Sequence, residues 1–342
     1  MKDNIINKLE VQLNNYKNQK EKNINEKNLK TDENVKIKIE NLYNNFNIKL
    51  RNPIHKLSYH TDRVYCLTIL KDGRLVSGSK DKSIIIYNKE TFKPDLTIKA
   101  HNGYVSCITT LSSGILASCS ADKTIKLFNI KNNGYNVLQT LNLHTDKVYK
   151  IIELKNKYLA SCSDDQSIKF YIKYNNEYII DYQVPTNGGC SSVIQTKDNE
   201  ICYSEKTNNS ICFFDLNERK IKSRLNNIIK NNDYYEWFIM INKDLLLIPG
   251  ANKISIINVN KYTLIRIIDV PNSSYIAGVC MLSENMLVTG DWEEKIKQWK
   301  IEGDNLVIIS QKEKTTGSDI NVLMNSGNGH IISGADDMIN IW

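Results

Sequence analysis

Short apolar runs alternate with polar turns from about Asn52 to the end of the chain. Asn52-Pro53 disfavours a continuing helix and favours extended backbone. Asp72-Gly73 then lies between the apolar runs Val64–Leu70 and Leu75–Ser79. A turn dipeptide between two such runs is a hairpin signal. The pattern predicts an all-β domain over 52–342.

Three segments of this domain are near copies of one another, at a period of just over forty residues. They are Leu75–Tyr87, Leu116–Phe128 and Leu159–Tyr171. Four weaker copies follow at similar spacing: 201–214, 246–258, 287–299 and 331–342. A repeat of about 40 residues made of short strands predicts a radial or stacked array, in which each unit buries its faces against its neighbours.

Residues 1–50 follow a different pattern and contain no Gly and no Pro. Apolar residues recur there at spacings of three and four, in two stripes: Ile5, Leu9, Leu13 and Tyr16, then Val35, Ile39, Leu42 and Phe46. This spacing predicts a helical extension of two short amphipathic helices. A coiled coil of this length is marginal alone, so a partly disordered tail is the alternative.

The repeats resemble those of WD-repeat proteins. The residues that carry the resemblance recur in the first three copies: His60, Ser77, Asp81 and Tyr87; His101, Ser118, Asp122 and Phe128; His144, Ser161, Asp165 and Tyr171. The resemblance implies a seven-bladed β-propeller over 52–342, with four strands in each blade. The chain departs from the family pattern at the signature Trp, which stands only at Trp299 and Trp342.

The resemblance also implies how the ring closes. The last copy stops at Trp342, after its third strand, and a spare strand-like segment, 54–57, precedes His60. In the family such a segment completes the last blade and thereby pairs two exposed sheet edges. We therefore expect 53–58 to pair antiparallel with 338–342.

The recurring His, Ser and Asp have two interpretations, a hydrolase triad or a structural network. An enzyme needs one site, whereas the same three residue types occur here three times at one period, so we favour the network. In the family the histidine bonds the turn aspartate and the serine joins them, which fixes the register of the blade. The chain has no P-loop, no His-Glu-x-x-His and no Gly-x-Ser-x-Gly. We predict no enzymatic activity and no cofactor.

The composition bears on metal binding, on the cellular compartment and on membrane association. The net charge of +7 is spread through Lys- and Asn-rich sequence. None of the eight Cys forms a Cys-x-x-Cys motif, and most lie in apolar runs, which is typical of reduced, buried thiols. We predict no metal site and a reducing compartment, the cytoplasm or, as the alternative, the nucleus. Neither a signal sequence nor an apolar run of about 18 residues occurs, so we expect no membrane association.

Candidate binding residues lie at the starts of the innermost strands and in the turns between second and third strands. In propellers these turns share one face, here called the top face, with the loops between blades. Eight residues align there: Arg63, Tyr65, Tyr104, Lys147, Tyr149, Tyr275, Trp292 and Asp319. Aromatic and Arg side chains dominate binding hot spots, although tyrosines can instead pack on neighbouring blades. Trp292 is the strongest candidate, since an indole in a polar turn has little packing reason to be there, whereas Trp237 is assigned to neither rim nor core.

The leading functional hypothesis is a non-catalytic scaffold that binds a peptide or protein on the top face, with 1–50 recruiting a second partner or self-associating. The first alternative is the substrate receptor of a ubiquitin ligase, although the closest match to a Trp-Asp-x-Arg ending, Phe214-Asp-Leu-Asn217, lacks the Arg. The second alternative is RNA or ribosome association, with tyrosines stacked on bases beside basic charge. A methyl-lysine cage of Tyr65, Tyr104 and Tyr149 is a variant of top-face binding.

Overall fold

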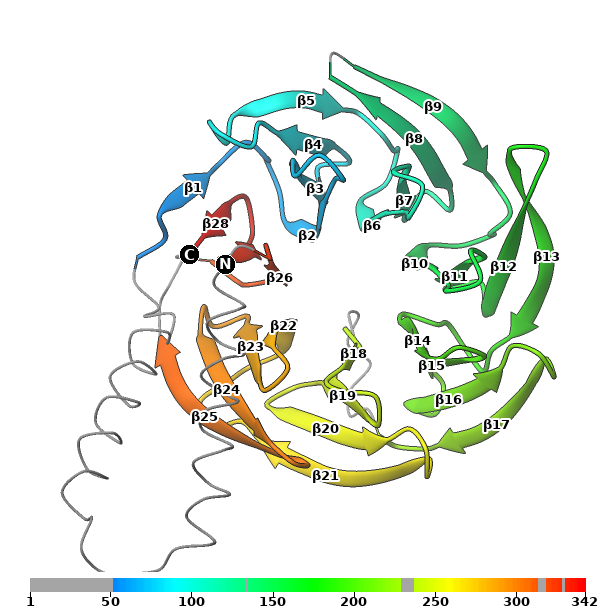
Figure 1. The fold of residues 1–342 in the computed structure, drawn as a ribbon, viewed down its shortest axis with the longest axis vertical. Coiled ribbons are helices and arrows are strands. Elements are labelled where there is room, and N and C mark those ends of the chain that lie inside the picture. Colours follow the sequence, from blue (N-terminus) through cyan, green and yellow to red (C-terminus); the bar gives the residue numbers. More distant parts are fainter. Residues whose placement is uncertain (1–51, 133, 229–236, 313–317, 328–329) are drawn as a thin grey trace, which may run out of the picture. The chain divides into compact units, whose positions relative to one another are not determined.

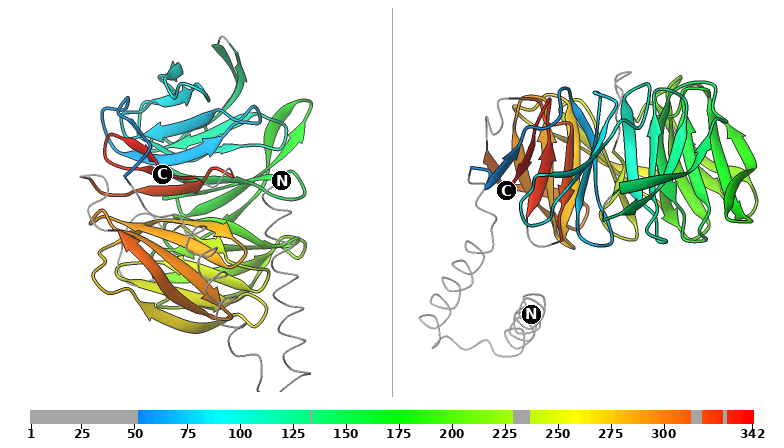
Figure 2. Two further views of the ribbon diagram at one scale, coloured as in Figure 1. Left: turned by 60° about the vertical axis from the view of Figure 1, so that its left-hand side comes forward. Right: turned by 90° about the horizontal axis from the view of Figure 1, so that it is seen from above.

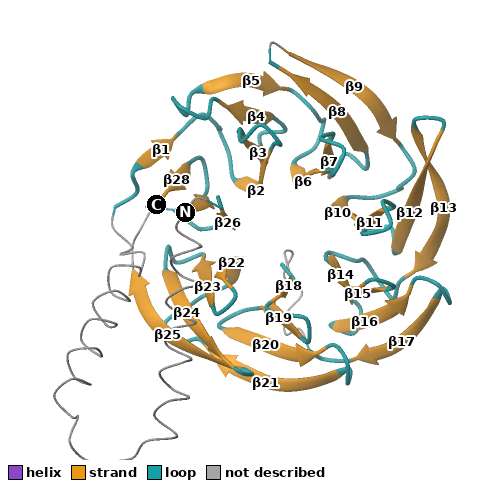
Figure 3. Cartoon of the chain, in the orientation of Figure 1, coloured by secondary structure: helices purple, strands orange, loops and turns teal. Residues whose placement is uncertain are grey.

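The computed structural model of the protein describes residues 52–132, 134–228, 237–312, 318–327 and 330–342. The predicted helical extension 1–50 lies outside these residues. Asn52–Trp342 forms one compact unit, in which seven four-stranded antiparallel sheets stand around a central axis (Figure 1). The secondary structure of the described residues consists of strands and turns only (Figure 3). The prediction of an all-β, seven-bladed propeller is confirmed.

Each of the first six blades is made by four consecutive strands, ordered from the axis outward (Figure 1). Blades 1 to 3 consist of β2 (Val64–Ile69), β3 (Leu75–Ser79), β4 (Ile84–Tyr87) and β5 (Pro94–Ile98); β6 (Val105–Thr110), β7 (Leu116–Ser120), β8 (Ile125–Lys131) and β9 (Gly134–Leu141); and β10 (Val148–Glu153), β11 (Leu159–Ser163), β12 (Ser167–Tyr174) and β13 (Glu177–Pro185).

The fourth and fifth copies, which spacing and hydrophobic pattern indicated more than residue identity, are full blades, and the sixth follows them. Blades 4 to 6 consist of β14 (Val193–Lys197), β15 (Glu200–Glu205), β16 (Ser210–Asp215) and β17 (Lys220–Leu225); β18 (Ile239–Met240), β19 (Leu245–Pro249), β20 (Lys253–Asn258) and β21 (Thr263–Asp269); and β22 (Ile276–Ser283), β23 (Met286–Asp291), β24 (Ile296–Glu302) and β25 (Asn305–Lys312).

Blade 7 combines the two ends of the described chain. Its inner strands are β26 (Val322–Asn325), β27 (Ile331–Gly334) and β28 (Ile339–Ile341), and its outermost strand is β1 (His55–Leu57). β1 pairs antiparallel with β28, with His55 opposite Ile341 and Leu57 opposite Ile339. The predicted closure is therefore confirmed, and it covers the edge that β28 would otherwise expose.

The core lies between neighbouring blades. Second strands such as β3, β7 and β11 are buried along their whole length, whereas the outer strands β5, β9 and β13 are largely exposed. Close packing between blades explains the small residue in the second strand. A Cβ added at Gly78 would lie 2.7 Å from Cys66 Sγ and 2.7 Å from Val105 of the next blade, and Cys119 and Cys162 hold the same place in blades 2 and 3.

Seen from the side, the strands of every blade run between the two faces of the ring (Figure 2). All loops between blades therefore reach one face, together with the turns between second and third strands. In the described part of the chain, no helix is both long and apolar enough to cross a membrane.

Candidate functional site

Backbone hydrogen bonds bring the turns and the strand starts together on the top face. The turn amides of Lys80, Asp164 and Trp292 donate to the carbonyl oxygens of Arg63, Lys147 and Tyr275, at 2.8, 2.9 and 3.1 Å. Lys206 of blade 4 donates to Gly189 in the same way, at 2.9 Å. The backbones of Arg63, Lys147, Tyr275 and Trp292 are therefore each tied to the neighbouring turn or strand start.

Arg63 joins blades 1 and 7 on this face. Its Nε lies 3.1 Å from Asp336 Oδ1 and its Nη2 lies 3.7 Å from Asp319 Oδ2, while all three side chains stay partly exposed. Burial and the nearby Asp336 carboxylate raise the pKa of Asp319, and Arg63 acts in the opposite direction. Asp336 was not among the candidates from sequence, because nothing in the sequence shows that its turn lies beside Arg63.

The tyrosines of the first three blades divide into two environments. Tyr65 and Tyr104 are partly exposed and meet edge to face, with ring centroids 5.6 Å apart. Tyr149 is buried, its hydroxyl donates to Asp164 at 2.7 Å, and the Lys206 ammonium lies 4.3 Å from its ring centroid. The cage hypothesis needs correction here, since the Tyr149 ring already carries a lysine from the protein itself.

Tyr275 and Trp292 form an aromatic pair in blade 6, with centroids 4.7 Å apart and planes tilted by 41°. Tyr275 is buried and Trp292 is partly buried, with its Nε1 enclosed and lacking an acceptor. The expectation that Trp292 has little packing reason for its position is wrong, because its ring packs against Tyr275. Two of the eight candidates, Tyr149 and Tyr275, are buried. The other six reach solvent in part: Arg63, Tyr65, Tyr104, Lys147, Trp292 and Asp319.

The repeated His, Ser and Asp form a hydrogen-bond chain in each of blades 1 to 3. In blade 3, His144 Nδ1 lies 2.7 Å from Asp165 Oδ2, His144 Nε2 lies 2.7 Å from Ser161 Oγ, and Ser161 Oγ lies 3.0 Å from the Tyr171 hydroxyl. A carboxylate only accepts, so Nδ1–H donates to Asp165, Nε2 accepts from Ser161, and Ser161 accepts from Tyr171. Each of the four side chains in this hydrogen-bond network thus has its partners.

Blades 1 and 2 repeat this geometry. The His Nδ1–Asp distances are 2.7 Å for His60 and Asp81 and 2.9 Å for His101 and Asp122. His60 Nε2 lies 2.6 Å from Ser77 Oγ, and His101 Nε2 lies 2.7 Å from Ser118 Oγ. Blade 1 ends at the Tyr87 hydroxyl, 3.1 Å from Ser77 Oγ, whereas blade 2 stops at Ser118 because Phe128 has no hydroxyl.

Burial alone would raise the pKa of each aspartate, but hydrogen bonds from the histidine and from a turn hydroxyl outweigh it and hold the pKa well below the usual range. The serines are completely buried. A nucleophile has to contact its substrate, so these triads do not form a hydrolytic site. Their chemistry is the satisfaction of buried polar groups.

The later blades place other residues where the serine stands. Strand pairing aligns Ser161 with Tyr203 in blade 4, Ile248 in blade 5, Thr289 in blade 6 and Ser333 in blade 7. The two Trp of the family signature keep the bond, since Trp299 Nε1 donates to Thr289 at 2.9 Å and Trp342 Nε1 donates to Ser333 at 3.0 Å. Blades 4 and 5 have no such bond in the described residues.

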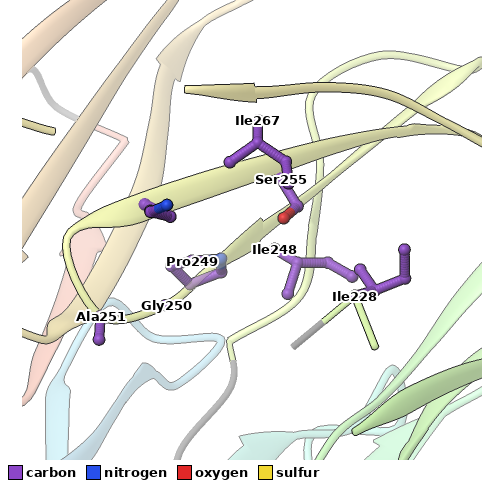
Figure 4. A pocket seen from close by; sticks show the side chains of 8 residues that line it. Ile228, Ile248, Pro249, Gly250, Ala251, Ser255 and Ile267 are labelled. Atoms are coloured by element: carbon purple, nitrogen blue, oxygen red, sulfur yellow. The ribbon is translucent and has the colours of Figure 1, made fainter. Parts of the chain in front are cut away.

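A pocket opens in blade 5 where the network stands in blades 1 to 3. It encloses about 360 Å³ of space, part of which is open to solvent, and is lined by Ile228, Ile248, Pro249, Gly250, Ala251, Lys253, Ser255 and Ile267 (Figure 4). Most of this lining is aliphatic. Ile248 replaces the serine, so the site offers an apolar surface in place of a polar network.

Trp237 lies at the axis of the ring. It packs against the core between blades 5 and 6 and against the core between blades 7 and 1. The Lys150 ammonium of blade 3 lies 4.8 Å from its ring centroid. A side chain that meets both sides of the ring must occupy the central channel, so Trp237 belongs to the core; the aromatic residues that precede it lie outside the described residues.

Three segments, 51–88, 92–129 and 135–171, match the family model of the WD domain, G-beta repeat. The chain carries three WD repeats. Each WD repeat spans the outermost strand of one blade and the first three strands of the next, beginning with β1 of blade 7. The inner three strands of blades 1 to 3 thus hold both the family match and the His-Ser-Asp network, which extends to a tyrosine hydroxyl in blades 1 and 3. A search of curated proteins finds no match to this chain.

Proposed function

We propose that this WD-repeat propeller is a non-catalytic interaction scaffold that binds a protein or peptide on its top face. Such propellers are typically protein-interaction scaffolds, and residues 1–50 would supply a second contact region or a means of self-association. The proposal places the protein in the cytoplasm. It is supported there by eight free, buried thiols in the described residues, which is typical of a reducing compartment.

The observation that carries the proposal is the charged group at the junction of blades 1 and 7. Arg63, Asp319 and Asp336 keep 41%, 32% and 40% of their side chains exposed. Ion pairs at this level of exposure contribute only about 0–1 kcal/mol to stability. The three side chains are therefore ordered without being needed for the fold, which is what a preorganised contact surface requires.

The distribution of charge supports a protein ligand over RNA. Residues 1–51 contain eleven Lys and Arg against seven Asp and Glu, so more than half of the +7 net charge precedes the propeller. The ring itself is close to balanced, and its top face carries acids beside Arg63. A nucleic-acid surface would instead gather positive charge along one stripe.

The test compares two variants of the full chain, each with one charge reversed. One variant changes the top face and the other changes the opposite face. Arg63→Glu changes the proposed contact surface, and Lys155→Glu is the matched control, because Lys155 is also exposed and ion-paired, with Asp198 at 2.6 Å. We expect partner capture to fall at least tenfold for Arg63→Glu only, at unchanged melting temperature. Trp292→Ala is a less specific probe of binding, since it also removes the packing of the indole against Tyr275.

Equal capture by both variants would contradict top-face binding at this junction. Captured material that disappears with nuclease or with modest salt would favour the RNA alternative. A partner set dominated by ubiquitin-ligase subunits, still dependent on Arg63, would place the scaffold in the substrate-receptor class.

A further inference from the structure

The outermost strand of each blade presents one open edge, because its sheet continues on the inner side only. β9 is the outermost strand of blade 2 and has β8 as its sheet neighbour (Figure 1). An edge strand carries unpaired backbone groups that can pair with a strand of another chain. Proteins commonly prevent this pairing with charged side chains or proline on the edge. The seven outer strands can therefore be compared by the protection that each one carries.

β9 lacks this protection. Of the seven outer strands that the structure describes, Gly134–Leu141 is the only one that contains neither a charged residue nor a proline. The other six contain Lys56; Pro94 and Asp95; Glu177, Asp181 and Pro185; Lys220, Lys222 and Arg224; Arg266 and Asp269; and Lys312. The edge of β9 is thus the one on which no charge of the strand itself opposes the addition of a further strand.

A bulge in the outer strand shows the difference most clearly. In blades 1 to 6 the register between the third and outer strands shifts by one position, which leaves one residue of the outer strand unpaired. This residue is charged in three blades, as Asp95, Asp181 and Lys222, and it is a partly buried isoleucine in blades 5 and 6. In blade 2 it is Leu138, which is 49% exposed. The bulge of β9 therefore presents an apolar side chain where other blades present a charge.

The edge of β9 is also apolar beyond the bulge and is held in place. Val137, next to the bulge residue, is 50% exposed. Gln139 fixes the strand against blade 3, since its Nε2 donates to the Tyr178 carbonyl and its Oε1 accepts from the Tyr178 amide, both at 2.8 Å. An ordered surface loses less conformational entropy on binding than a loose one. β9 is therefore a preorganised template for a second strand.

We propose that β9 pairs antiparallel with β9 of a second copy of this chain, which joins two propellers in a dimer with twofold symmetry. The charge distribution selects this partner. A twofold contact brings a surface against itself, and like charges opposite each other destabilise a sheet. The outer strand β17 would repel its own copy through Lys220, Lys222 and Arg224, whereas the uncharged β9 is compatible with its own copy.

Self-pairing at β9 leaves both top faces free. The strands of each blade run between the two faces of the ring (Figure 2). Antiparallel pairing points the two β9 strands in opposite directions, so the two top faces point to opposite sides of the dimer. Blade 2 and its copy then form one sheet of eight strands. Such a dimer presents two binding faces, which raises the avidity for a partner with two epitopes.

The experiment measures the mass of the full chain in solution by sedimentation over a concentration series. Leu138→Asp gives β9 the acidic bulge residue that blades 1 and 3 carry. Leu264→Asp is the matched control, because Leu264 is a 37% exposed leucine on the outer strand β21. We expect the dissociation constant of the dimer to rise at least about tenfold for Leu138→Asp only. Both variants should keep the melting temperature of the native chain within a few degrees.

Single cysteines locate the contact on the strand. All eight native cysteines of the described chain are buried, whereas Asn136, Leu138 and Thr140 are exposed. A cysteine placed at each of these positions in turn should form a disulfide between two chains under mild oxidation. The yield should be highest at the position nearest the twofold axis and fall away from it. A cysteine at Leu264 should give no such product.

Three outcomes would overturn the proposal. The first is a chain that stays monomeric throughout the concentration series. The second is a dimer that Leu138→Asp leaves intact, which would point to residues 1–50 as the contact. The third is a monomer whose capture of other proteins depends on Leu138, which would assign the edge to a strand of a different protein. Arg63→Glu should leave the dimer unchanged, so the result is independent of top-face binding.

Discussion

Blades 3 and 5 fill the same position with opposite chemistry. Ser161 of β11 lies in a chain of bonds from Asp165 through His144 to Tyr171. Ile248 of β19 occupies the equivalent place and borders an aliphatic pocket. Both blades are nevertheless four-stranded antiparallel sheets in one ring.

The difference separates the interactions that form the sheet of a blade from those that fix its register. Blade 5 shows that strand pairing and apolar faces are sufficient for the sheet. Blade 4 takes an intermediate route, since Tyr203 replaces the serine and its buried hydroxyl has no partner. The network of blades 1 to 3 adds specificity of register, because a polar chain is satisfied in only one arrangement.

The largest expected loss of stability comes from exchanging the side chains at the position that Ser161 holds in blade 3 and Ile248 holds in blade 5. Ser161→Ile would leave His144 Nε2 and the Tyr171 hydroxyl without partners and overfill the site, which costs about 3–6 kcal/mol of unfolding free energy. Ile248→Ser would lose about 2–4 kcal/mol through a cavity and a buried hydroxyl. Denaturant unfolding of both variants measures the difference, and a tolerated Ser161→Ile would show that blade 3 does not need its network.

Removing the carboxylate from blade 2 should have the next largest effect. Asp122→Ala removes the acceptor of the Asn102 amide and the nearer partner of His101 Nδ1, which keeps Thr124 Oγ1 at 3.1 Å; this costs about 1–3 kcal/mol. Partner capture at low temperature should not change selectively. Full stability together with lost function would instead assign Asp122 a direct functional role.

Removing one tyrosine hydroxyl from blade 3 or from blade 4 should change the unfolding free energy by a smaller amount. Tyr171→Phe removes a bond to Ser161 at 3.0 Å and should cost about 1 kcal/mol. Tyr203→Phe removes a buried hydroxyl without a partner and should be neutral or slightly stabilising. Matched thermal unfolding of the two variants is the measurement, and equal losses would contradict the assignment of the bond in blade 3.

The smallest expected effect is the pH dependence that His144 contributes in blade 3. Burial lowers the pKa of His144, so the unfolded chain binds a proton there while the folded chain does not. Stability should fall as pH drops below about 6.5, the unfolded value. The depressed aspartates add a second loss below about pH 4. His144→Gln should flatten the first step in denaturant titrations, and an unchanged step would exclude His144 as its source.

Much of the site could be assigned from sequence because the copies align. The positions of the network residues repeat at a fixed spacing, and the resemblance to WD-repeat proteins implied their bonding, the closing strand and the location of the rim. The exposure of single rim residues did not follow. Tyr65 and Tyr149 hold equivalent positions, yet only Tyr149 is buried, since it meets Asp164 and Lys206 from a neighbouring turn and blade.

The sequence by itself determined an all-β array of repeats, because that depends on period and alternation along the chain, and its resemblance to WD-repeat proteins implied the seven blades, their four strands and the antiparallel closure of β1 on β28. Only the tertiary structure decided that Arg63 lies between Asp319 and Asp336 and that Trp237 packs both between blades 5 and 6 and between blades 7 and 1. The physical reason is that each of these contacts joins different blades. Local pattern sets each blade, whereas contacts between blades exist only once the ring has closed.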